Sequence, residues 1–286
     1  MHINTKLLWV FIALTLVGCS SENKNVDSLV IIHTTFGNIT VVLFDDTPKH
    51  KESFIAMSKE GMYDSTTFYR VIHEFMIQGG DVASKSGFAN ESKRLIPAEI
   101  RTNHLHVKGA LAAARQPDNV NPERKSSTQF YIVQGRKFSE KELKTDISKL
   151  NYAAGQYLQS EDNLPLRDSL VIMQEQGKFA ELQAILVNLK EDIATYTAMD
   201  LDKTATPEQI ELYTTIGGYP YIDFEYTIFG QVLEGLEVVD KIASVQTGAA
   251  DKPLDDIYIK MEVIELRKSE ITKKYGYEYP ILEVDK

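Results

Sequence analysis

Short runs of β-branched and aromatic residues, separated by turns that contain glycine, recur along most of this chain of 286 residues. Residues 30–35 and 39–44 form two such runs around Gly37-Asn38, which predicts a β-hairpin. Many short strands with only two accompanying helices favour a mainly β fold, a closed or nearly closed antiparallel sheet. The further strands are expected at residues 67–71, 76–79, 109–114, 130–133, 226–232 and 257–266, and the helices at about 48–60 and around 238–242.

A different periodicity occupies residues 136–216. Apolar residues recur there at helical spacing, from Leu143 to Tyr157 and again from Phe179 to Ile193. Thr206-Pro207-Glu208-Gln209 has the composition of a helix start. We expect an α-helical insertion between two strands, whose helices pack on one another beside the sheet. Packing on the sheet itself, dimerisation, and an arm that clasps other proteins are the alternatives.

Residues 1–18 have the pattern of a signal peptide, because Lys6 precedes an apolar run that is too short to span a bilayer comfortably. The run ends in Leu16-Val17-Gly18-Cys19, which resembles the bacterial lipobox, a signal in which cleavage precedes a cysteine that is then lipidated. Cys19 is the only cysteine, so no internal disulfide can form. We predict a lipid on Cys19 and a polar tether over residues 19–28. An ordinary cleaved signal with a chance cysteine is the alternative.

The net charge of the chain limits the classes of macromolecule that it is expected to bind. Acidic residues outnumber basic ones by 41 to 31, for a formal net charge of −10. A negatively charged body is repelled by phosphate backbones, and no run of basic residues offsets this charge. We therefore expect no nucleic-acid partner.

Four separated motifs follow one another in the chain. The first is Phe68-Tyr69-Arg70-Val71-Ile72-His73-Glu74-Phe75-Met76-Ile77-Gln78-Gly79-Gly80-Asp81, and the others occupy residues 109–115, 127–133 and 221–240. In this order they resemble the cyclophilins, a family of peptidyl-prolyl cis-trans isomerases. Apart from the insertion, the resemblance covers nearly everything from about Leu29 to Leu266.

This resemblance implies a closed antiparallel barrel of eight strands with two flanking helices, formed by residues 29–135 and 217–268. Residues 136–216 are then the helical insertion, and residues 269–286 form a C-terminal tail. The implied activity is isomerisation of X–Pro peptide bonds, which requires no cofactor and no metal. A peptide bond resists rotation with a barrier of about 18–20 kcal/mol, and a catalyst needs only to lower this barrier.

The resemblance also assigns roles to individual residues. Arg70 matches the catalytic arginine, and Gln78 matches a polar position that orients it. An apolar pocket for the proline ring is implied at Phe75, Met76, Tyr131 and Ile222. Gln129 matches a position that binds the substrate backbone, and Ala114 and Arg115 match the segment that pairs with the residues before proline. Tyr221 and Tyr226 complete the expected substrate-binding residues.

Several positions depart from the best-known family members. Tyr69 replaces a histidine, Tyr131 a phenylalanine, Tyr221 a tryptophan and Tyr226 a histidine. The missing tryptophan N–H at Tyr221 predicts weak or no binding of cyclosporin. His104 and His106 flank an expected strand, and we interpret them as surface residues and not as a metal site.

The leading functional hypothesis is a prolyl isomerase that assists the folding of exported proteins, whose proline-containing segments are its clients. A lipid on Cys19 would hold it in the bacterial cell envelope, on the periplasmic side or on the outer surface of the outer membrane. The alternatives are a chaperone-like binding module with little or no turnover, and a purely structural envelope lipoprotein that would need no complete pocket.

Overall fold

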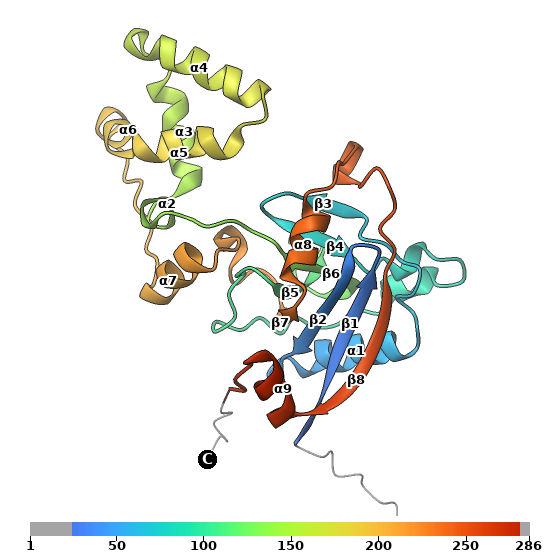
Figure 1. The fold of residues 1–286 in the computed structure, drawn as a ribbon. Coiled ribbons are helices and arrows are strands. Elements are labelled where there is room, and N and C mark those ends of the chain that lie inside the picture. Colours follow the sequence, from blue (N-terminus) through green and yellow to red (C-terminus); the bar gives the residue numbers. More distant parts are fainter. Residues whose placement is uncertain (1–24, 281–286) are drawn as a thin grey trace, which may run out of the picture.

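The computed structural model describes residues 25–280, except the side chains of residues 92 and 93. Eight strands form one antiparallel sheet in the order β3-β4-β6-β5-β7-β2-β1-β8 (Figure 1). The mainly β, eight-stranded antiparallel architecture expected from the sequence is confirmed. The strands are β1 (Val26–Thr34), β2 (Gly37–Leu43), β3 (Arg70–Ile72), β4 (Met76–Gly79), β5 (Ala110–Arg115), β6 (Ser126–Val133), β7 (Ile228–Glu234) and β8 (Lys260–Arg267).

Alternation along the strands gives the sheet two different faces. Val71, Ile77, Ile132 and Leu111 lie side by side across β3, β4, β6 and β5, and all four are buried in the main core. Helices α1 (Pro48–Lys59) and α8 (Leu236–Ala243) contribute apolar side chains to that same core. These are the two flanking helices that the sequence predicts. The residues that alternate with these four along each strand therefore point to the opposite face of the sheet.

The two end strands of the sheet, β3 and β8, are not hydrogen-bonded neighbours. The segments that precede them do meet. The Phe68 N–H donates to the Ile257 carbonyl at 2.9 Å, and the Ile259 N–H donates to the Thr66 carbonyl at 2.8 Å. The segment just before β3, where the strand was expected to begin at residue 67, therefore pairs with the segment just before β8.

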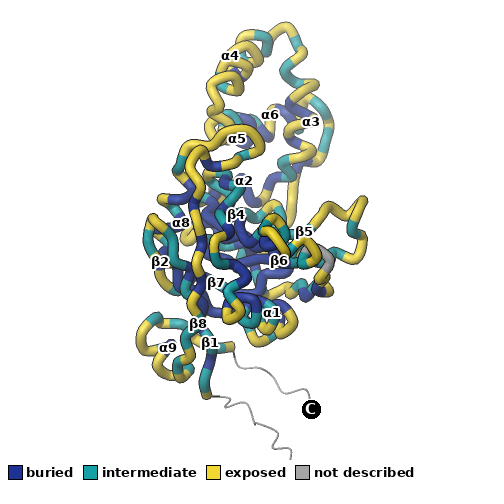
Figure 2. The backbone as a smooth tube through the Cα atoms, turned by 90° about the vertical axis from the view of Figure 1, so that its right-hand side faces the viewer, coloured by how far each residue is buried: buried dark blue, intermediate teal, exposed yellow. Residues whose placement is uncertain are grey.

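The insertion forms a helical lobe beside the sheet (Figure 1). Its helices are α2 (Glu140–Leu143), α3 (Ile147–Tyr157), α4 (Leu164–Glu175), α5 (Phe179–Asn188), α6 (Lys190–Thr197) and α7 (Pro207–Thr215). Leu150, Leu186 and Ile193 are at the centre of a core that belongs to the insertion alone. Figure 2 shows this second buried region, and shows α4 largely exposed. Helices α3 to α6 therefore pack on one another, whereas Leu143 of α2 and Tyr213 of α7 pack with Leu105 from the sheet body. Thr206 caps α7 with Gln209 as expected.

The chain leaves and re-enters the sheet through glycines. Arg136 and Gly218 exchange backbone hydrogen bonds of 3.1 and 2.9 Å, and Gly218 also forms a bridge with Val107. Gly135 has φ +60° and Gly218 has φ +147°. A Cβ atom at Gly218 would lie 2.2 Å from the His106 carbonyl oxygen. A Cβ atom at Gly135 would lie 2.2 Å from the Gly218 carbonyl oxygen, so the two joints of the insertion cross too closely for a side chain.

The ends of the described chain differ in detail from the expectation. β1 begins at Val26, which pairs with Arg267 of β8, so residues 26–28 belong to a strand and not to the tether. Asp27 made this stretch look solvated, but its carboxylate binds the Lys51 ammonium at 2.7 Å. The predicted C-terminal tail opens with α9 (Lys268–Tyr275), which buries Ile271 completely. The predicted signal peptide and Cys19 lie outside the described residues.

None of the helices between residues 25 and 280 combines the length and the hydrophobicity that a bilayer crossing needs.

The close crossing at Gly218 makes a testable prediction. Gly218→Ala should lower the free energy of unfolding by about 3 kcal/mol, because the added methyl group collides with the backbone of residues 106 and 107. Gly155→Ala is the control: it lies within α3 with nothing within 4 Å of the new Cβ, and should stabilise by about 0.5–1 kcal/mol. Urea unfolding of both variants measures the difference, and equal stabilities would contradict the crossing.

Candidate active site

The strand register places the expected catalytic residues in one row. Arg70 pairs with Gln78 across β3 and β4, Gln78 pairs with Tyr131 across β4 and β6, and Tyr131 pairs with Ala112 of β5. Directly opposed residues of neighbouring strands point to the same face. The row lies on the face of the sheet that is turned away from the main core, because the alternate residues of the same strands fill that core.

The expected substrate-binding residues gather on this face. Met76 and Tyr131 are 2% and 4% exposed and are two of the buried members of an apolar cluster. Its half-buried members include four more of the predicted residues, Phe75, Ala114, Ile222 and Tyr226. Residues from β4, β5, β6 and the loop before β7 thus form the walls of one apolar site.

A ladder of aromatic rings extends this site on one side. Phe75 stacks on Tyr219 with 4.1 Å between ring centroids, and Tyr219 meets Tyr221 edge-on at 5.2 Å. Tyr221 is 39% exposed and lies outside the apolar cluster, at the rim. Burial raises the pKa of its hydroxyl to about 12.

The opposite side of the site is formed by Ala114 and Arg115. The Arg115 guanidinium lies 4.7 Å above the ring of Tyr226, and its Nε donates to the Glu225 carbonyl at 3.0 Å. The ladder between β5 and β6 shifts register between Ala113 and Arg115, and pairing on the β7 side ends where the Ala113 N–H donates to the Thr227 carbonyl at 2.9 Å. Beyond that point the edge of β5 has the geometry for pairing with an extended peptide.

Gln78 of this row is linked to Gln129 through the Tyr69 hydroxyl. The Gln78 amide donates to the Tyr69 hydroxyl, which donates to the Gln129 side-chain oxygen at 2.8 Å. Gln129 in turn donates to Asp81 at 3.1 Å. Burial, then the nearby Asp81 charge, raises the pKa of Tyr69 to about 12, so this hydroxyl stays protonated. The amide nitrogen of Gln78 is thus engaged with Tyr69, and the expected role of Gln78 in orienting Arg70 stays a prediction.

Arg70 has a different partner. Its Nε lies 3.3 Å from the Asp251 carboxylate, and its side chain is 42% exposed. Asp251 ends the short 3-10 helix Ala249–Asp251, and both Ala250 and Asp251 have positive φ, at 57° and 58°. Such backbone is unusual for residues other than glycine. This backbone conformation brings the Asp251 carboxylate to the Arg70 guanidinium. Nothing in the local sequence indicates that contact.

His106 lies far deeper in the structure than the sequence predicts. It was expected at the surface, yet it is completely buried beneath the site. Its Nδ1 lies 3.2 Å from Asp223, and its Nε2 lies 2.9 Å from the Tyr131 hydroxyl. A carboxylate beside Nδ1 favours the tautomer with a proton there, which leaves Nε2 to accept from Tyr131. The hydroxyl that distinguishes Tyr131 from phenylalanine therefore has a partner.

The Asp223 carboxylate joins this network to the insertion. Besides His106, it accepts from the Tyr213 hydroxyl at 2.7 Å and from the Gln209 amide at 3.2 Å, both on α7. The Asp223 side chain is 4% exposed. Burial and then the Asp223 charge raise the pKa of Tyr213 far above its ordinary value, so the hydroxyl stays a donor. Helix α7 of the insertion is thus bonded to the floor of the site.

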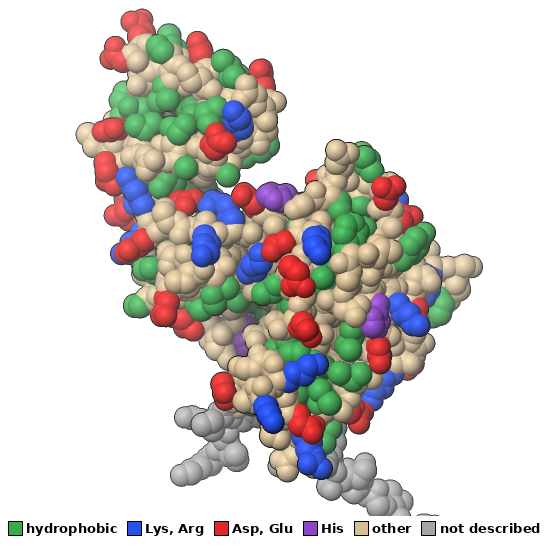
Figure 3. All heavy atoms as spheres, in the orientation of Figure 1, with side chains coloured by type: hydrophobic (Ala, Val, Ile, Leu, Met, Phe, Trp, Pro, Cys, Tyr) green, Lys and Arg blue, Asp and Glu red, His purple; other side chains and the backbone are tan. Residues whose placement is uncertain are grey.

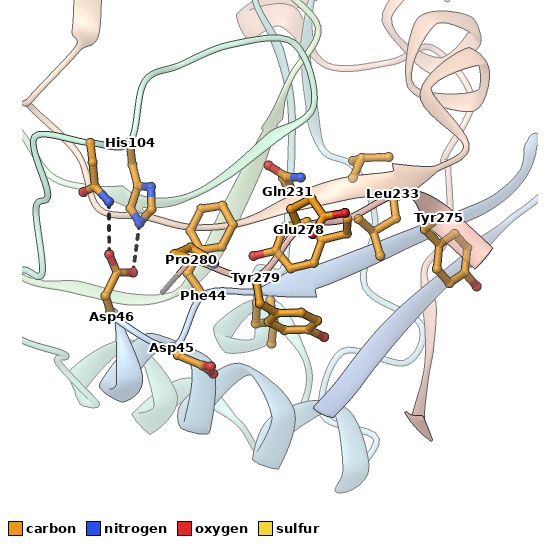
Figure 4. Close-up of a pocket in the computed structure, with 15 residues that line it drawn as sticks. Phe44, Asp45, Asp46, His104, Gln231, Leu233, Tyr275, Glu278, Tyr279 and Pro280 are labelled. Atoms are coloured by element: carbon orange, nitrogen blue, oxygen red, sulfur yellow. Dashed lines mark hydrogen bonds and ion pairs between the residues drawn. The ribbon is translucent and has the colours of Figure 1, made fainter. Parts of the chain in front are cut away.

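His104 is likewise not a solvated surface residue. It bonds Asp46 at 2.9 Å and stacks on Phe44 at 4.3 Å. Both contacts border a second cavity of about 450 Å³, whose far wall is the segment from Tyr275 to Pro280 (Figure 4). That cavity shares none of the predicted site residues. Among the described residues, no group of three or more histidine, cysteine or acidic side chains could hold a metal ion.

Known proteins resemble the chain as a whole. The family profile for cyclophilin type peptidyl-prolyl cis-trans isomerase/CLD matches residues 29–146 and 131–263. A Staphylococcus epidermidis protein that bears the name of a peptidyl-prolyl cis-trans isomerase is 30% identical over 249 residues, covering 86% of this chain and 96% of the relative. A Staphylococcus aureus protein of that name is 30% identical over 239 residues, covering 82% and 91%.

The chain therefore belongs to the cyclophilin-type peptidyl-prolyl cis-trans isomerases. A crystal structure of a Cryptosporidium parvum cyclophilin type isomerase is 18% identical and superposes with a TM-score of 0.46, over 85% of this chain and 99% of that chain. The family assignment rests on the profile and on the bacterial relatives, and not on this weaker likeness.

The hydrogen bond between Tyr131 and His106 leads to a testable prediction for this site. Tyr131→Phe should lower the free energy of unfolding by about 1–3 kcal/mol, because it leaves the buried Nε2 of His106 without a partner. The ring that lines the apolar site is kept. Tyr152→Phe, which removes a hydroxyl from a side chain that is 66% exposed, should change stability by less than about 0.5 kcal/mol. Urea unfolding measures both, and a fully stable Tyr131→Phe would refute the buried bond.

Proposed function

We propose that this isomerase acts on X–Pro bonds of exported polypeptides through Arg70, while held at a membrane by a lipid on Cys19. The observation that carries the catalytic part is the row of Arg70, Gln78 and Tyr131 beside an apolar cluster. A charged donor stands at the edge of a site that can hold a proline ring.

The chemistry of rotation explains why this arrangement suits isomerisation. As the bond twists, the proline nitrogen regains its lone pair and the carbonyl loses polarity. A guanidinium directed at that nitrogen binds the twisted state more tightly than either planar isomer, which lowers the barrier. Asp251 occupies the Nε of Arg70, so the terminal N–H groups of this half-exposed side chain remain for the substrate.

The rest of the site would bind and orient the substrate. The proline ring would lie against Phe75, Met76, Tyr131 and Ile222, where exclusion of water favours the less polar twisted amide. The residues before proline would pair with the edge of β5 at Ala114 and Arg115. Gln129, held by Tyr69 and Asp81, would contact the substrate backbone. No step requires a metal or a cofactor.

Arg70→Ala tests the catalytic assignment. It should lower kcat/KM by about 100-fold or more, the effect of removing one preorganised donor from a transition state. The assay is protease-coupled isomerisation of a proline tetrapeptide by the chain from residue 20 onward. Arg101→Ala is the matched control, because Arg101 bonds the Asp46 carbonyl away from the site. Equal rates for Arg70→Ala and the unsubstituted protein would favour the binding-module alternative.

Asp251 should act on the reaction through Arg70. Asp251→Ala is expected to lower kcat/KM by about twofold to fivefold, because an exposed ion pair is worth up to about 1 kcal/mol. Asp251→Asn should keep most of the activity, since its amide oxygen can still accept from Nε. The same tetrapeptide assay measures both. If the alanine and asparagine variants lose activity equally, charge and not orientation is the contribution of Asp251.

The lipid anchor places the enzyme in the bacterial cell envelope, on the periplasmic side or on the outer surface of the outer membrane. It is supported by the signal-like residues 1–18 and by the Leu16-Val17-Gly18-Cys19 motif. Two or more acyl chains anchor a protein stably, whereas one alone is marginal. Because uncatalysed X–Pro isomerisation is slow, the role of the enzyme would be to assist the folding of exported clients.

Mass spectrometry of protein purified from membranes tests the anchor. The N-terminal peptide should begin at Cys19 and carry the added mass of acyl chains, and Cys19→Ser should move the protein to the soluble fraction. An unmodified N-terminal peptide beginning at or near Cys19, with the protein already soluble, would support an ordinary cleaved signal instead.

Three finer points belong to the same proposal. The sheet closes into a barrel through the segments before β3 and β8, supported by the backbone hydrogen bonds between them and by the bridge between Thr67 and Tyr258. Cyclosporin binds weakly or not at all, because Tyr221 offers a hydroxyl at the rim in place of an indole N–H. Nucleic acid is not a partner of a body with a formal charge of −10.

A further inference from the structure

A groove separates the sheet from the helical insertion. It encloses about 780 Å³ and takes residues from both bodies, among them Phe75, Tyr219 and Tyr221 from the sheet side and Ile147, Phe179 and Gln183 from the insertion. Figure 3 shows the molecule hollowed between the helical lobe and the sheet. A cavity of this size holds several side chains.

The groove continues the proposed proline site. Phe75 belongs both to the apolar cluster with Met76 and Tyr131 and to the wall of the groove. From Phe75 the ring ladder through Tyr219 to Tyr221 runs along that wall. Ala114 and Arg115, the proposed site for residues before proline, are not part of the groove. The groove therefore starts on the side of the site where residues after proline would leave it.

The insertion offers apolar surface to this groove. Phe179 was expected on the buried stripe of its helix, but it is the first residue of α5 and is 63% exposed. The side-chain amide nitrogen of Gln183, one helical turn further on, is buried without a hydrogen-bond partner. An unpaired buried donor is costly, and a peptide carbonyl could satisfy it after a rotation of the amide.

The charge of Arg136 in the groove wall is already compensated. Its guanidinium bonds Glu142 at 2.8 Å, lies 3.9 Å from Glu74, and covers the ring of Phe138 at 4.0 Å. A charged client residue would have to compete with these contacts. An apolar side chain would only have to cover Phe179 and Tyr221, which are exposed.

We propose that the groove binds the residues that follow proline in an extended client, with an aromatic side chain against Phe179. This inference rests on the proposed function, since it adds a specificity site to the same substrate path. The insertion thereby makes the isomerase selective for unfolded segments in which an aromatic residue follows X–Pro by about two positions.

Two peptides of equal composition test the direction of the groove. Ala-Ala-Pro-Ala-Phe-Ala has its aromatic residue after proline, and Ala-Phe-Ala-Pro-Ala-Ala has it before. Each is titrated calorimetrically into the full chain in detergent, and cis–trans exchange of each is followed by NMR. The first peptide should bind about fivefold to tenfold more tightly, the range expected when one well-placed aromatic contact is added.

Phe179→Ala should abolish that preference and leave the second peptide unchanged. Tyr152→Ala removes an exposed aromatic residue of the insertion that does not line the groove, and it should change neither affinity. Exposure of both residues means that neither substitution disturbs a core.

The outcomes separate this inference from the proposed function. Normal exchange of both peptides with no effect of Phe179→Ala overturns the groove and leaves the isomerase. A preference that depends on Phe179 without any catalysed exchange supports the groove and overturns the proposed catalysis. An equal loss in Phe179→Ala and Tyr152→Ala also overturns the groove.

Discussion

The buried carboxylate of Asp223 is the interaction on which the arrangement of this protein depends. It accepts hydrogen bonds from His106 beneath the site and from Tyr213 and Gln209 on α7. A charge that is 4% exposed is tolerated only when donors surround it. Because His106 in turn bonds Tyr131, one chain of hydrogen bonds runs from the insertion to the wall of the proline site. The insertion is therefore structurally part of the site and not merely attached beside it.

The backbone contacts where the insertion joins the sheet also make the insertion part of the site. Gly135 and Gly218 bring the two ends of the insertion into direct backbone contact, so it leaves and re-enters the sheet at one point next to His106. A lobe held only there could swing, but the bonds from α7 to Asp223 add a second attachment. The groove with Phe179 lies between these attached bodies. A fixed lobe is what a site for extended clients requires, since a groove that must first form binds less tightly.

Much of the fold follows from sequence, because the period of two in strands and of 3.6 in helices is a local signal. The strands, α1, α8 and the start of α7 were all predictable in this way, and the motif from Phe68 to Asp81 places Arg70 and Gln78 in register. Burial of His106 was not, because its partners are Tyr131 and Asp223, which lie 25 and 117 residues further along the chain. The exposure of Phe179 and the contact of Asp251 with Arg70 also arise only in three dimensions. One signal was available: a tyrosine in an apolar site where phenylalanine is usual needs a partner for its hydroxyl.

A double-mutant cycle between Tyr213→Phe and Tyr131→Phe tests most directly whether the insertion and the proline site form one unit. The two hydroxyls do not touch, but they share the His106–Asp223 pair. Free energies of unfolding of the single and double variants should show a coupling of about 0.5 kcal/mol or more, as expected for members of one buried network. Additive effects, with a coupling below about 0.3 kcal/mol, would mean that the network does not connect the insertion to the site.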